Sequence, residues 1–362
     1  MAASRRSVPS PLDVADLRER VHKALSAFLA EQVGVLDRIA EELGPIGTAV
    51  SDFLLDGGKR LRPAFCYWGW RGAGGPDSDE IVAAAASLEL LQACALIHDD
   101  VMDGSDTRRG RPAVHRGFAA LHRGEGWLGD PETFGTSAAI LLGDLCLIWA
   151  DQLLNTCGLP DVMLRRGAPT YDEMRVELMA GQYLDLLEQA LGGRDIDRAL
   201  RVARYKSAKY TIERPLHLGG VLAGAPTELL ATYTGYGLPL GEAFQLRDDV
   251  LGVFGDPSET GKPAGDDLRE GKRTALVAIA LDRATPDQAA VVRRHLGDPH
   301  LDERGVALLR DVIDGTGALA EVEALIARRT DEAHSALGAG VLEPAAREVL
   351  GNLVSAATSR RV

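Results

Sequence analysis

Three aspartates, Asp99, Asp100 and Asp103, have the types and spacing expected of a metal site. They follow an apolar run that begins near Ile81 and keeps helical spacing. On a helix, Asp99 and Asp103 lie on the same face, and carboxylates at the end of an apolar helix are costly to bury without a cation. Oxygen ligands without nearby cysteines or paired histidines favour Mg²⁺ over Zn²⁺. The sequence therefore predicts a helix end that binds magnesium.

A second acidic pair, Asp248–Asp249, ends another apolar stretch much further along the chain. One acidic helix end is weak evidence, because most runs of charge are solvated surfaces. Two such ends that face each other across a helical bundle could hold several divalent ions around one polyanion. Three arginines, Arg108, Arg109 and Arg111, follow the first cluster, and guanidinium groups bind phosphate well. Together these residues predict a phosphorylated, metal-bridged ligand, most naturally a diphosphate.

A glycine turn within residues 56–63 brings further cations to the start of a helix. Two glycines precede Lys59, and Arg62 precedes Pro63, which favours a helix start. Such a turn can present backbone N–H groups and side-chain cations to an anion together. Taken alone, the stretch could also be a solvated basic loop.

A glycine-rich stretch over residues 255–267 follows the second acidic pair. It contains Lys262, and Lys272 follows shortly after it. We expect this stretch to act as a mobile lid whose lysines reach a bound anion.

The elements that must position these residues have the apolar spacing of helices. The sequence lacks the sustained alternation typical of strands and any repeat of about 20–50 residues. We therefore predict an all-α protein, a single large antiparallel helical bundle with a central cavity over residues 11–362, preceded by a disordered segment over 1–10. Helices are expected at 14–43, 47–55, 81–103, 136–156, 170–191, 197–222 with a kink at Pro215, and over much of 273–360, with a loop or short helix at 117–135. Capping boxes are expected at Asp77 with Glu80, Thr170 with Glu173, and Thr285 with Gln288.

The bulk composition narrows the possible functions. A chain of 362 residues exceeds the usual size of one core, but 46% apolar and only 5% aromatic residues suit one large helical body. A net charge of −13 argues against nucleic-acid or anionic-membrane binding, and it makes the local basic clusters more informative.

The cysteines and the N-terminus indicate a soluble, cytoplasmic protein that is not an integral membrane protein. All four cysteines lie in apolar stretches without a Cys-x-x-Cys pair, so buried free thiols are expected. The first residues lack an apolar signal core, and no uninterrupted apolar run reaches about 18 residues.

Several reaction classes are excluded because the sequence lacks their motifs. The sequence contains no Gly-x-x-x-x-Gly-Lys-Ser/Thr loop for nucleotide hydrolysis, and no Ser/His/Asp or Cys/His arrangement for covalent catalysis. What remains is metal-assisted departure of diphosphate, with an apolar cavity that shelters a carbocation from water.

The chain resembles the polyprenyl synthetase family, the trans-isoprenyl diphosphate synthases, over roughly residues 20–350. Five motifs in the same order make a coincidence improbable. They are Gly57-Gly58-Lys59-Arg60-Leu61-Arg62-Pro63; Asp99-Asp100-Val101-Met102-Asp103 with Arg108-Arg109-Gly110; Gly181-Gln182 with Asp185; Phe244-Gln245 with Asp248-Asp249; and the lysines Lys262 and Lys272.

The resemblance implies a fold of the isoprenoid synthase type and a chain-elongating prenyltransferase. Such an enzyme joins isopentenyl diphosphate to dimethylallyl, geranyl or farnesyl diphosphate, uses about three magnesium ions, and is expected to form a homodimer. The implied metal ligands are Asp99, Asp103 and Asp248, and these form the catalytic set together with Lys209. Arg108, Lys209, Lys262, Lys272, Thr211 and Gln245 would bind the allylic diphosphate, and Lys59, Arg62, Arg109 and Gln92 the isopentenyl diphosphate.

The chain departs from the family pattern at three places. Gln92 replaces a histidine that many members carry, and it can donate a hydrogen bond but adds no charge. Gly252 replaces the third acid of the second cluster, so that either Asp256 compensates or Asp248 suffices alone. The Lys-Thr pattern of the family is also spaced differently around Lys206 and Lys209 in this chain. Lys209 is the preferred lysine, and Lys206 is the alternative.

The residues before Asp99 bear on product length, because a growing tail would extend along that helix. Cys94 and Ala95 are small, so the tail should pass them and meet Leu91 or Leu88. We predict mainly the C20 product, geranylgeranyl diphosphate, with C15 or C25 and longer products as alternatives.

Two other functions stay open at this point. A class I terpene cyclase shares the fold type, but it lacks the Lys59/Arg62 site and usually carries an Asn-x-x-x-Ser-x-x-x-Glu motif, which is absent near residue 248. A non-catalytic partner subunit has Gly252 as its only support. Elsewhere, Asp144 is expected to be a buried structural acid, and Arg111 and Arg247 could pair with acids instead of with substrate.

Overall fold

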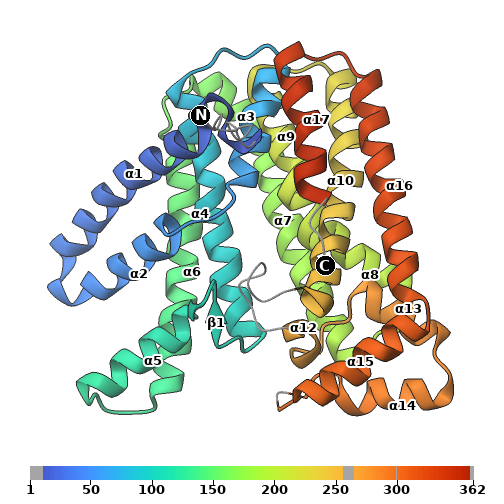
Figure 1. Ribbon diagram of the computed structural model, residues 1–362. Coiled ribbons are helices and arrows are strands. Elements are labelled where there is room, and N and C mark those ends of the chain that lie inside the picture. The colour runs from blue at the N-terminus through green and yellow to red at the C-terminus, as the bar shows by residue number, and fades with distance from the viewer. Residues whose placement is uncertain (1–10, 256–264, 299, 359–362) are drawn as a thin grey trace, which may run out of the picture.

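The computed structural model describes residues 11–255, 265–298 and 300–358 and is built almost entirely of helices (Figure 1). This confirms the predicted all-α fold. Among the described residues the only strands are β1, Thr107–Arg108, and β2, Arg111–Pro112, which pair antiparallel in a short hairpin after the first acidic cluster. Residues 1–10 lie outside the described ranges, and the single domain over 11–362 stays a prediction.

The longer helices, such as α4, α6 and α16, run along the length of the molecule (Figure 1). In chain order the helices are η1 Pro11–Asp16, α1 Leu17–Ile39, η2 Glu41–Leu43, α2 Gly44–Leu55, α3 Leu61–Gly72, α4 Asp79–Met102, α5 Val114–Glu125, α6 Pro131–Asn155, α7 Asp161–Leu191, α8 Ile196–Val202, η3 Ala203–Glu213, α9 Arg214–Ala223, α10 Thr227–Phe254, α12 Asp266–Arg269, α13 Ala275–Arg283, α14 Pro286–His295, α15 Glu303–Gly315, α16 Ala318–Ala339 and α17 Pro344–Thr358.

Two of the three expected capping boxes are wrong. Helix α7 begins at Asp161, so Thr170 lies inside it and caps nothing. At α4 the cap position is Ser78, and Asp77 instead accepts a hydrogen bond from Arg20 at 2.8 Å. The capping box of Thr285 with Gln288 is confirmed, with both reciprocal hydrogen bonds present.

The core is apolar and centred on α4, the helix that ends in the first acidic cluster. Leu88, Leu90 and Leu91 of α4 are completely buried, and α4 packs against α3 and α6. Trp68, Trp70 and Trp149 are buried in this core, and the expected burial of the four free cysteines is confirmed. A long, buried and rigid helix therefore carries Asp99 to its position.

Where a kink at Pro215 was expected, the structure has a π-helix, η3, just before that proline. Pro215 itself lies in the first turn of α9. Glycines let η3 pack closely between α7 and α10. A Cβ at Gly181 of α7 would lie 2.4 Å from the backbone nitrogen of Lys206, and one at Gly241 of α10 would lie 2.6 Å from the Cα of Ala208. Because these approaches involve backbone atoms, the two glycines fix the position of η3.

By length and composition, α4 and α6 could each cross a membrane. The apolar window of α4 is 72% buried inside the protein and that of α6 is 39% buried. Core helices of soluble proteins have the same properties, so two such helices are weak evidence for membrane insertion.

We predict that Gly241→Ala destabilises the protein and lowers its activity, because the added methyl group must displace η3. Overpacking of this kind costs about 1–3 kcal/mol. The matched control is Gly338→Ala in α16, where an added Cβ meets nothing within 4 Å and the helix should gain up to about 1 kcal/mol. Urea unfolding of both variants measures the difference, and equal stabilities would show that the close packing at Gly241 is unimportant.

Candidate active site

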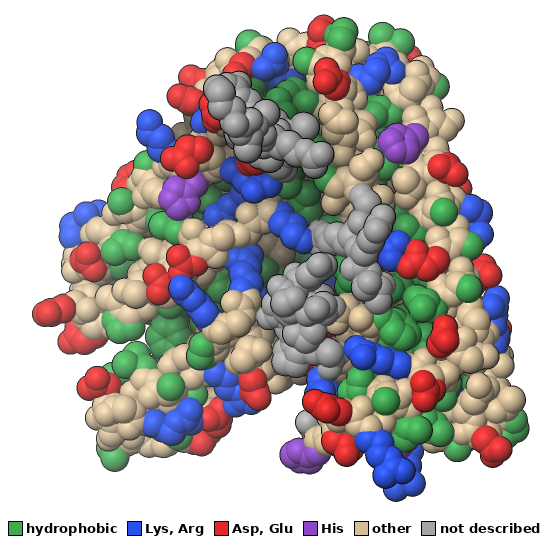
Figure 2. Space-filling model, viewed as in Figure 1, with side chains coloured by type: hydrophobic (Ala, Val, Ile, Leu, Met, Phe, Trp, Pro, Cys, Tyr) green, Lys and Arg blue, Asp and Glu red, His purple; other side chains and the backbone are tan. Residues whose placement is uncertain are grey.

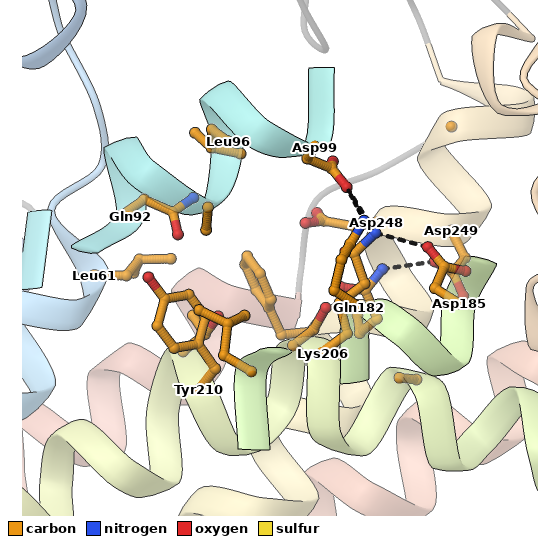
Figure 3. Close-up of a pocket in the computed structure, with 18 of the residues that line it drawn as sticks. Leu61, Gln92, Leu96, Asp99, Gln182, Asp185, Lys206, Tyr210, Asp248 and Asp249 are labelled. Carbon is orange, nitrogen blue, oxygen red and sulfur yellow. Dashed lines mark hydrogen bonds and ion pairs between the residues drawn. The ribbon is translucent and has the colours of Figure 1, made fainter. Parts of the chain in front are cut away.

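A cavity of about 860 Å³ lies between α4, α7, η3 and α10, and both acidic clusters reach it. Figure 3 shows Asp99 descending from α4 toward Asp248 and Asp249 of α10. The space-filling view shows Lys and Arg side chains gathered around the hollow in the centre of this face (Figure 2). The structure thus brings together distant parts of the sequence. Predicted site residues on its wall are Lys59, Arg62, Gln92, Asp99, Arg108, Arg109, Thr211, Gln245, Asp248 and Lys272.

Lys206 of η3 lies at the polar centre of the cavity (Figure 3). Its Nζ is 2.9 Å from Oδ1 of Asp99 and 2.7 Å from Oδ2 of Asp185 on α7. The amide of Gln182 donates a second hydrogen bond to Asp99, at 2.8 Å. The structure therefore uses Lys206 as the counterion of the first acidic cluster.

Lys209, the lysine preferred from the sequence, lies elsewhere. Its Nζ is 2.5 Å from Glu177 and 3.8 Å from Glu213, and it is not on the cavity wall. The reason is the π-helix, whose wider turn sends residues three apart to different faces. We correct the choice to Lys206. Ser207 and Tyr210, which line the cavity, were missed, although Ser207 directly follows this lysine in the sequence.

Asp100 positions an arginine and faces away from the cavity. It is completely buried, and it accepts hydrogen bonds from Nε and Nη2 of Arg108, the Nε bond being 3.0 Å long. Although burial opposes the charge on Arg108, its hydrogen bonds with Asp100 raise its pKa. The Arg108 guanidinium, which lines the cavity, therefore stays charged and in one orientation.

The carboxyl groups of the first cluster have divergent pKa values. Burial and the neighbouring Asp99 raise the pKa of Asp103 to about 6. Burial also opposes ionisation of Asp99, but Lys206 and Lys272 outweigh it and lower its pKa to about 2. Neither oxygen of Asp103 has a hydrogen-bond partner among the described residues, and Lys272 is 3.6 Å away. Buried carboxylate oxygens that accept no hydrogen bond favour the binding of a cation.

Burial also affects a carboxyl group of the second cluster. Burial raises the pKa of Asp249 to about 8, against the effect of Gln245, whose amide donates a hydrogen bond to it at 2.7 Å. Gln245 thus supports Asp249 as well as lining the cavity.

At the other end of the cavity, Arg62 is held in place by two contacts. Its guanidinium lies 4.3 Å from the ring centre of Tyr210, and its Nη2 donates to the hydroxyl of Thr211 at 2.7 Å. Arg60 of the same loop, at φ +54°, also lines the cavity and makes a buried ion pair of 2.5 Å with Glu89. This pair, which the sequence did not suggest, anchors the basic loop.

Gln92 and Arg109 also border this end of the cavity. The Oε1 of Gln92 is buried and accepts no hydrogen bond from the described residues. The guanidinium of Arg109 lies 5.7 Å from the ring of Phe53, and burial lowers its pKa. Two polar groups are therefore available beside the loop that carries Lys59.

The remaining predicted residues lie away from the cavity or outside the described ranges. Lys262 falls within 256–264, which the structure does not describe. Arg111 pairs with Asp56, and Arg247 pairs with Glu323 at 2.5 Å. The expectation for Asp144 is wrong, because its side chain is 58% exposed and lies 3.7 Å from His98.

The apolar part of the cavity begins beside Gln92. Ala95 and Leu96 of α4 line it, opposite Leu61 and Tyr210 (Figure 3). Leu178 and Phe244 complete this wall. The cavity therefore combines an acidic end and a basic end with an apolar wall.

The expected tail-facing residues before Asp99 only partly reach the cavity. Ala95 lines it, whereas Cys94, Leu91 and Leu88 are completely buried in the core and are not on its wall. A tail that grows past Ala95 would have to displace this packing.

A family model described as polyprenyl synthetase matches residues 45–312. The chain belongs to the polyprenyl synthetase family. It is 33% identical over 270 residues to the geranylfarnesyl diphosphate synthase of Aeropyrum pernix, covering 73% of this chain and 77% of that protein. The octaprenyl diphosphate synthase of Escherichia coli is 31% identical over 308 residues, covering 84% and 86%.

The similarity to one solved structure covers nearly the whole of this chain. That structure is the geranylgeranyl pyrophosphate synthase of Corynebacterium glutamicum in complex with isoprenyl diphosphate and magnesium. This structure superposes with a TM-score of 0.93 at 42% identity, covering 95% of this chain and 99% of that one.

The acidic clusters of this polyprenyl synthetase fit magnesium. All available donors are carboxylate oxygens, which suit a hard cation, and both oxygens of Asp103 lack hydrogen bonds. Among the described residues no three acidic groups converge closely enough to hold an ion in this conformation, because Lys206 and Lys272 lie between them.

We predict that Lys206→Met abolishes most of the activity of this polyprenyl synthetase while Lys209→Met retains it. Removing one cation from a charge-stabilising site costs about 10²–10³ in turnover, and Lys209 only pairs with Glu177 and Glu213. Diphosphate release assays on both purified variants test this. A larger loss in Lys209→Met would reinstate the residue preferred from the sequence.

Proposed function

We propose that this polyprenyl synthetase condenses isopentenyl diphosphate with an allylic diphosphate, and that its main product is the C20 compound geranylgeranyl diphosphate. The observation that carries the proposal is one cavity that two acidic clusters, several cations and an apolar wall line together. Dimethylallyl, geranyl and farnesyl diphosphates are the primers, and C15 or C25 and longer products are the alternatives.

The acidic end of the cavity is suited to departure of the allylic diphosphate. Magnesium, held by Asp99, Asp103 and Asp248, would supply charge stabilisation on the diphosphate oxygens when bound. Arg108, Lys206 and Lys272 would bind the same diphosphate, with Lys262 as the fourth cation. Their positive charges favour the step in which the carbon–oxygen bond breaks and the diphosphate leaves with the electron pair.

The basic end of the cavity, beside the loop that carries Lys59, binds the second substrate. Lys59, Arg62 and Arg109 would hold isopentenyl diphosphate, with Gln92 as a hydrogen-bond donor. The double bond of isopentenyl diphosphate attacks the allylic cation, which forms the new carbon–carbon bond, and the released diphosphate takes the proton that is lost. The apolar wall keeps water from the cation.

The choice of C20 rests on similarity and on the size of Ala95. Geranylgeranyl synthases are among the relatives and solved structures that this chain resembles. Ala95 leaves the first level of the apolar wall open, and the packed Leu91 and Leu88 lie beyond it.

We predict that the purified protein with magnesium and isopentenyl diphosphate yields mainly C20 alcohol after dephosphorylation, and that Ala95→Phe shortens the product to C15. An aromatic ring at residue 95 would fill the space along the apolar wall through which the growing prenyl tail must pass. Ala95→Ser, of nearly the same size, is the control and should keep the C20 product. Chromatography of the alcohols gives the chain length, and release of only C15 by the unaltered protein would refute the pocket argument.

The same incubation separates the rival functions. A terpene cyclase would not consume isopentenyl diphosphate, and a non-catalytic partner subunit would turn over only with an added synthase. The intact pair of acidic clusters in one cavity favours an active synthase.

We also propose that the protein is a cytoplasmic homodimer that uses an apolar surface on α6 and α7. Ile140, Leu141 and Ile148 of α6 are exposed, as are Val176 and Met179 of α7. The two helices are adjacent there, since Arg175 and Asp151 form an ion pair of 3.2 Å. Apolar side chains gathered in this way indicate a protein interface.

We predict that Ile148→Lys produces monomers, because it places a charge within this apolar surface. Light scattering should give the mass of two chains for the unaltered protein and of one for the variant. Val341→Lys alters an even more exposed apolar residue elsewhere and should leave the dimer intact. Monomers in the unaltered protein would count against the dimer.

A further inference from the structure

A second cavity, of about 900 Å³, lies outside the active site between α2, the β1–β2 hairpin and α5. Its apolar walls include Ala49, Phe53, Val114, Phe118 and Leu121, and we call it the α2–α5 groove. Figure 2 shows hydrophobic side chains gathered between the two lobes at the lower left, where α2 and α5 lie in Figure 1. The proposed condensation makes no use of this cavity.

Two helix faces form the walls of the α2–α5 groove. Ala49 and Phe53 are four residues apart and therefore share one face of α2, as Val114, Phe118 and Leu121 share one face of α5. Each helix has 12 residues and is about 18 Å long. The groove thus offers an apolar surface of the shape and length that suit an extended hydrocarbon chain.

The hairpin closes one end of the α2–α5 groove with positive charge. Arg108, Arg109 and Arg111 line this end, together with Asp52 and Asp56. Arg111 pairs with Asp56, but both side chains are more than half exposed, and ion pairs of that kind are weak. The arginines outnumber the aspartates, so this end of the groove is suited to an anion.

Arg109 is the cation of this end that lacks an acidic partner. Its Nη1 donates to the backbone oxygen of Phe53 at 3.4 Å, but among the described residues it forms no ion pair with a carboxylate. Arg109 and Gly110 are the two central residues of the hairpin, at φ +54° and +74°. Asn, Asp or Gly is usual in such a turn, and an arginine held in this unfavourable conformation indicates a function for its side chain.

We propose that the α2–α5 groove binds a prenyl diphosphate, with the diphosphate on Arg109 and Arg111 and the isoprenoid tail between α2 and α5. The choice of ligand rests on the proposed function, which makes such molecules the products of this protein. Guanidinium groups bind phosphate oxygens in pairs, and the apolar walls remove the tail from water.

Arg109 also lines the active-site cavity, where it is proposed to bind isopentenyl diphosphate. A prenyl diphosphate in the α2–α5 groove therefore competes with isopentenyl diphosphate for the same guanidinium. Accumulated product would in this way slow its own synthesis.

The first test measures binding of geranylgeranyl diphosphate to the full chain by titration calorimetry in EDTA, which keeps magnesium from the acidic clusters. Gly117→Leu fills the α2–α5 groove, since Gly117 lines it and an added Cβ meets nothing within 4 Å. Each buried CH₂ group that the tail loses weakens binding about fourfold, so the loss should be about 10–60-fold.

Gly124→Leu is the matched control for Gly117→Leu. Gly124 lies on the same helix, is equally open around its Cβ and does not line the groove. This variant should bind geranylgeranyl diphosphate like the unaltered protein. Equal binding by the two variants, with circular dichroism showing both folded, would overturn the proposal.

Other ligands test the two halves of the site. Inorganic pyrophosphate has no tail to reach Gly117, so Gly117→Leu should leave its binding unchanged. Myristate has a long apolar chain but only one carboxylate, and it should bind the unaltered protein more weakly than geranylgeranyl diphosphate does. Myristate binding as tight as that of the diphosphate would overturn the assignment of the ligand.

The second test measures how geranylgeranyl diphosphate inhibits turnover at varied isopentenyl diphosphate. It should raise the KM for isopentenyl diphosphate in the unaltered protein and in Gly124→Leu. The inhibition constant should be about 10–60-fold higher in Gly117→Leu, because less of the tail is buried there. The same inhibition constant in all three proteins would mean that the product acts only in the active site, against the proposal.

Turnover without added product separates this proposal from the proposed function. Neither glycine lines the active-site cavity, so both variants should turn over isopentenyl diphosphate like the unaltered protein. No turnover by the unaltered protein counts against the proposed function itself. Turnover together with unchanged binding in Gly117→Leu counts against the groove alone.

Discussion

The structure depends on the concentration of carboxylates at one end of an apolar cavity. Asp99, Asp103 and Asp249 are all largely buried, and each would be costly to ionise there without positive charge nearby. Lys206 and Lys272 supply that charge from two other elements. The helices that carry these residues must therefore be held rigidly, because a displaced lysine would leave a buried carboxylate unpaired.

Close helix packing provides this rigidity. Helix η3 lies directly against the backbones of α7 and α10 at Gly181 and Gly241, so Lys206 has little freedom to move with its backbone. Arg62 is fixed differently, by its stacking on Tyr210 and its hydrogen bond to Thr211. The acidic end is thus positioned by backbone contacts and the opposite basic end by side-chain contacts.

The helical class and the two acidic clusters could be predicted from the sequence, because apolar spacing and motif order are local properties. Lys206 could not be chosen over Lys209, since a π-helix changes which residues share a face. The start of α7 was missed because Pro169 lies inside the helix, where a proline is usually taken to end one.

The α2–α5 groove was also beyond the sequence, since it depends on how α2, α5 and the hairpin lie in space. A run of arginines indicates an anion site, but only the fold shows that Arg108 and Arg109 border two cavities. Whether Asp256 replaces the acid missing at residue 252 stays a prediction, because Asp256 lies outside the described residues.

The two kinds of cation at the site have different physical roles. Arg108 is fixed by its hydrogen bonds to Asp100, which does not line the cavity, so it can face a phosphate without losing its partner. Lys206 and Lys272 instead pair with the carboxylates proposed to hold magnesium. A lysine ammonium is a compact charge on a flexible stem, so it can move from carboxylate to phosphate when a metal ion takes its place. Such an exchange would keep Asp99 and Asp103 close to a positive charge both before and after the ligand binds, a role that suits a flexible lysine better than the fixed Arg108.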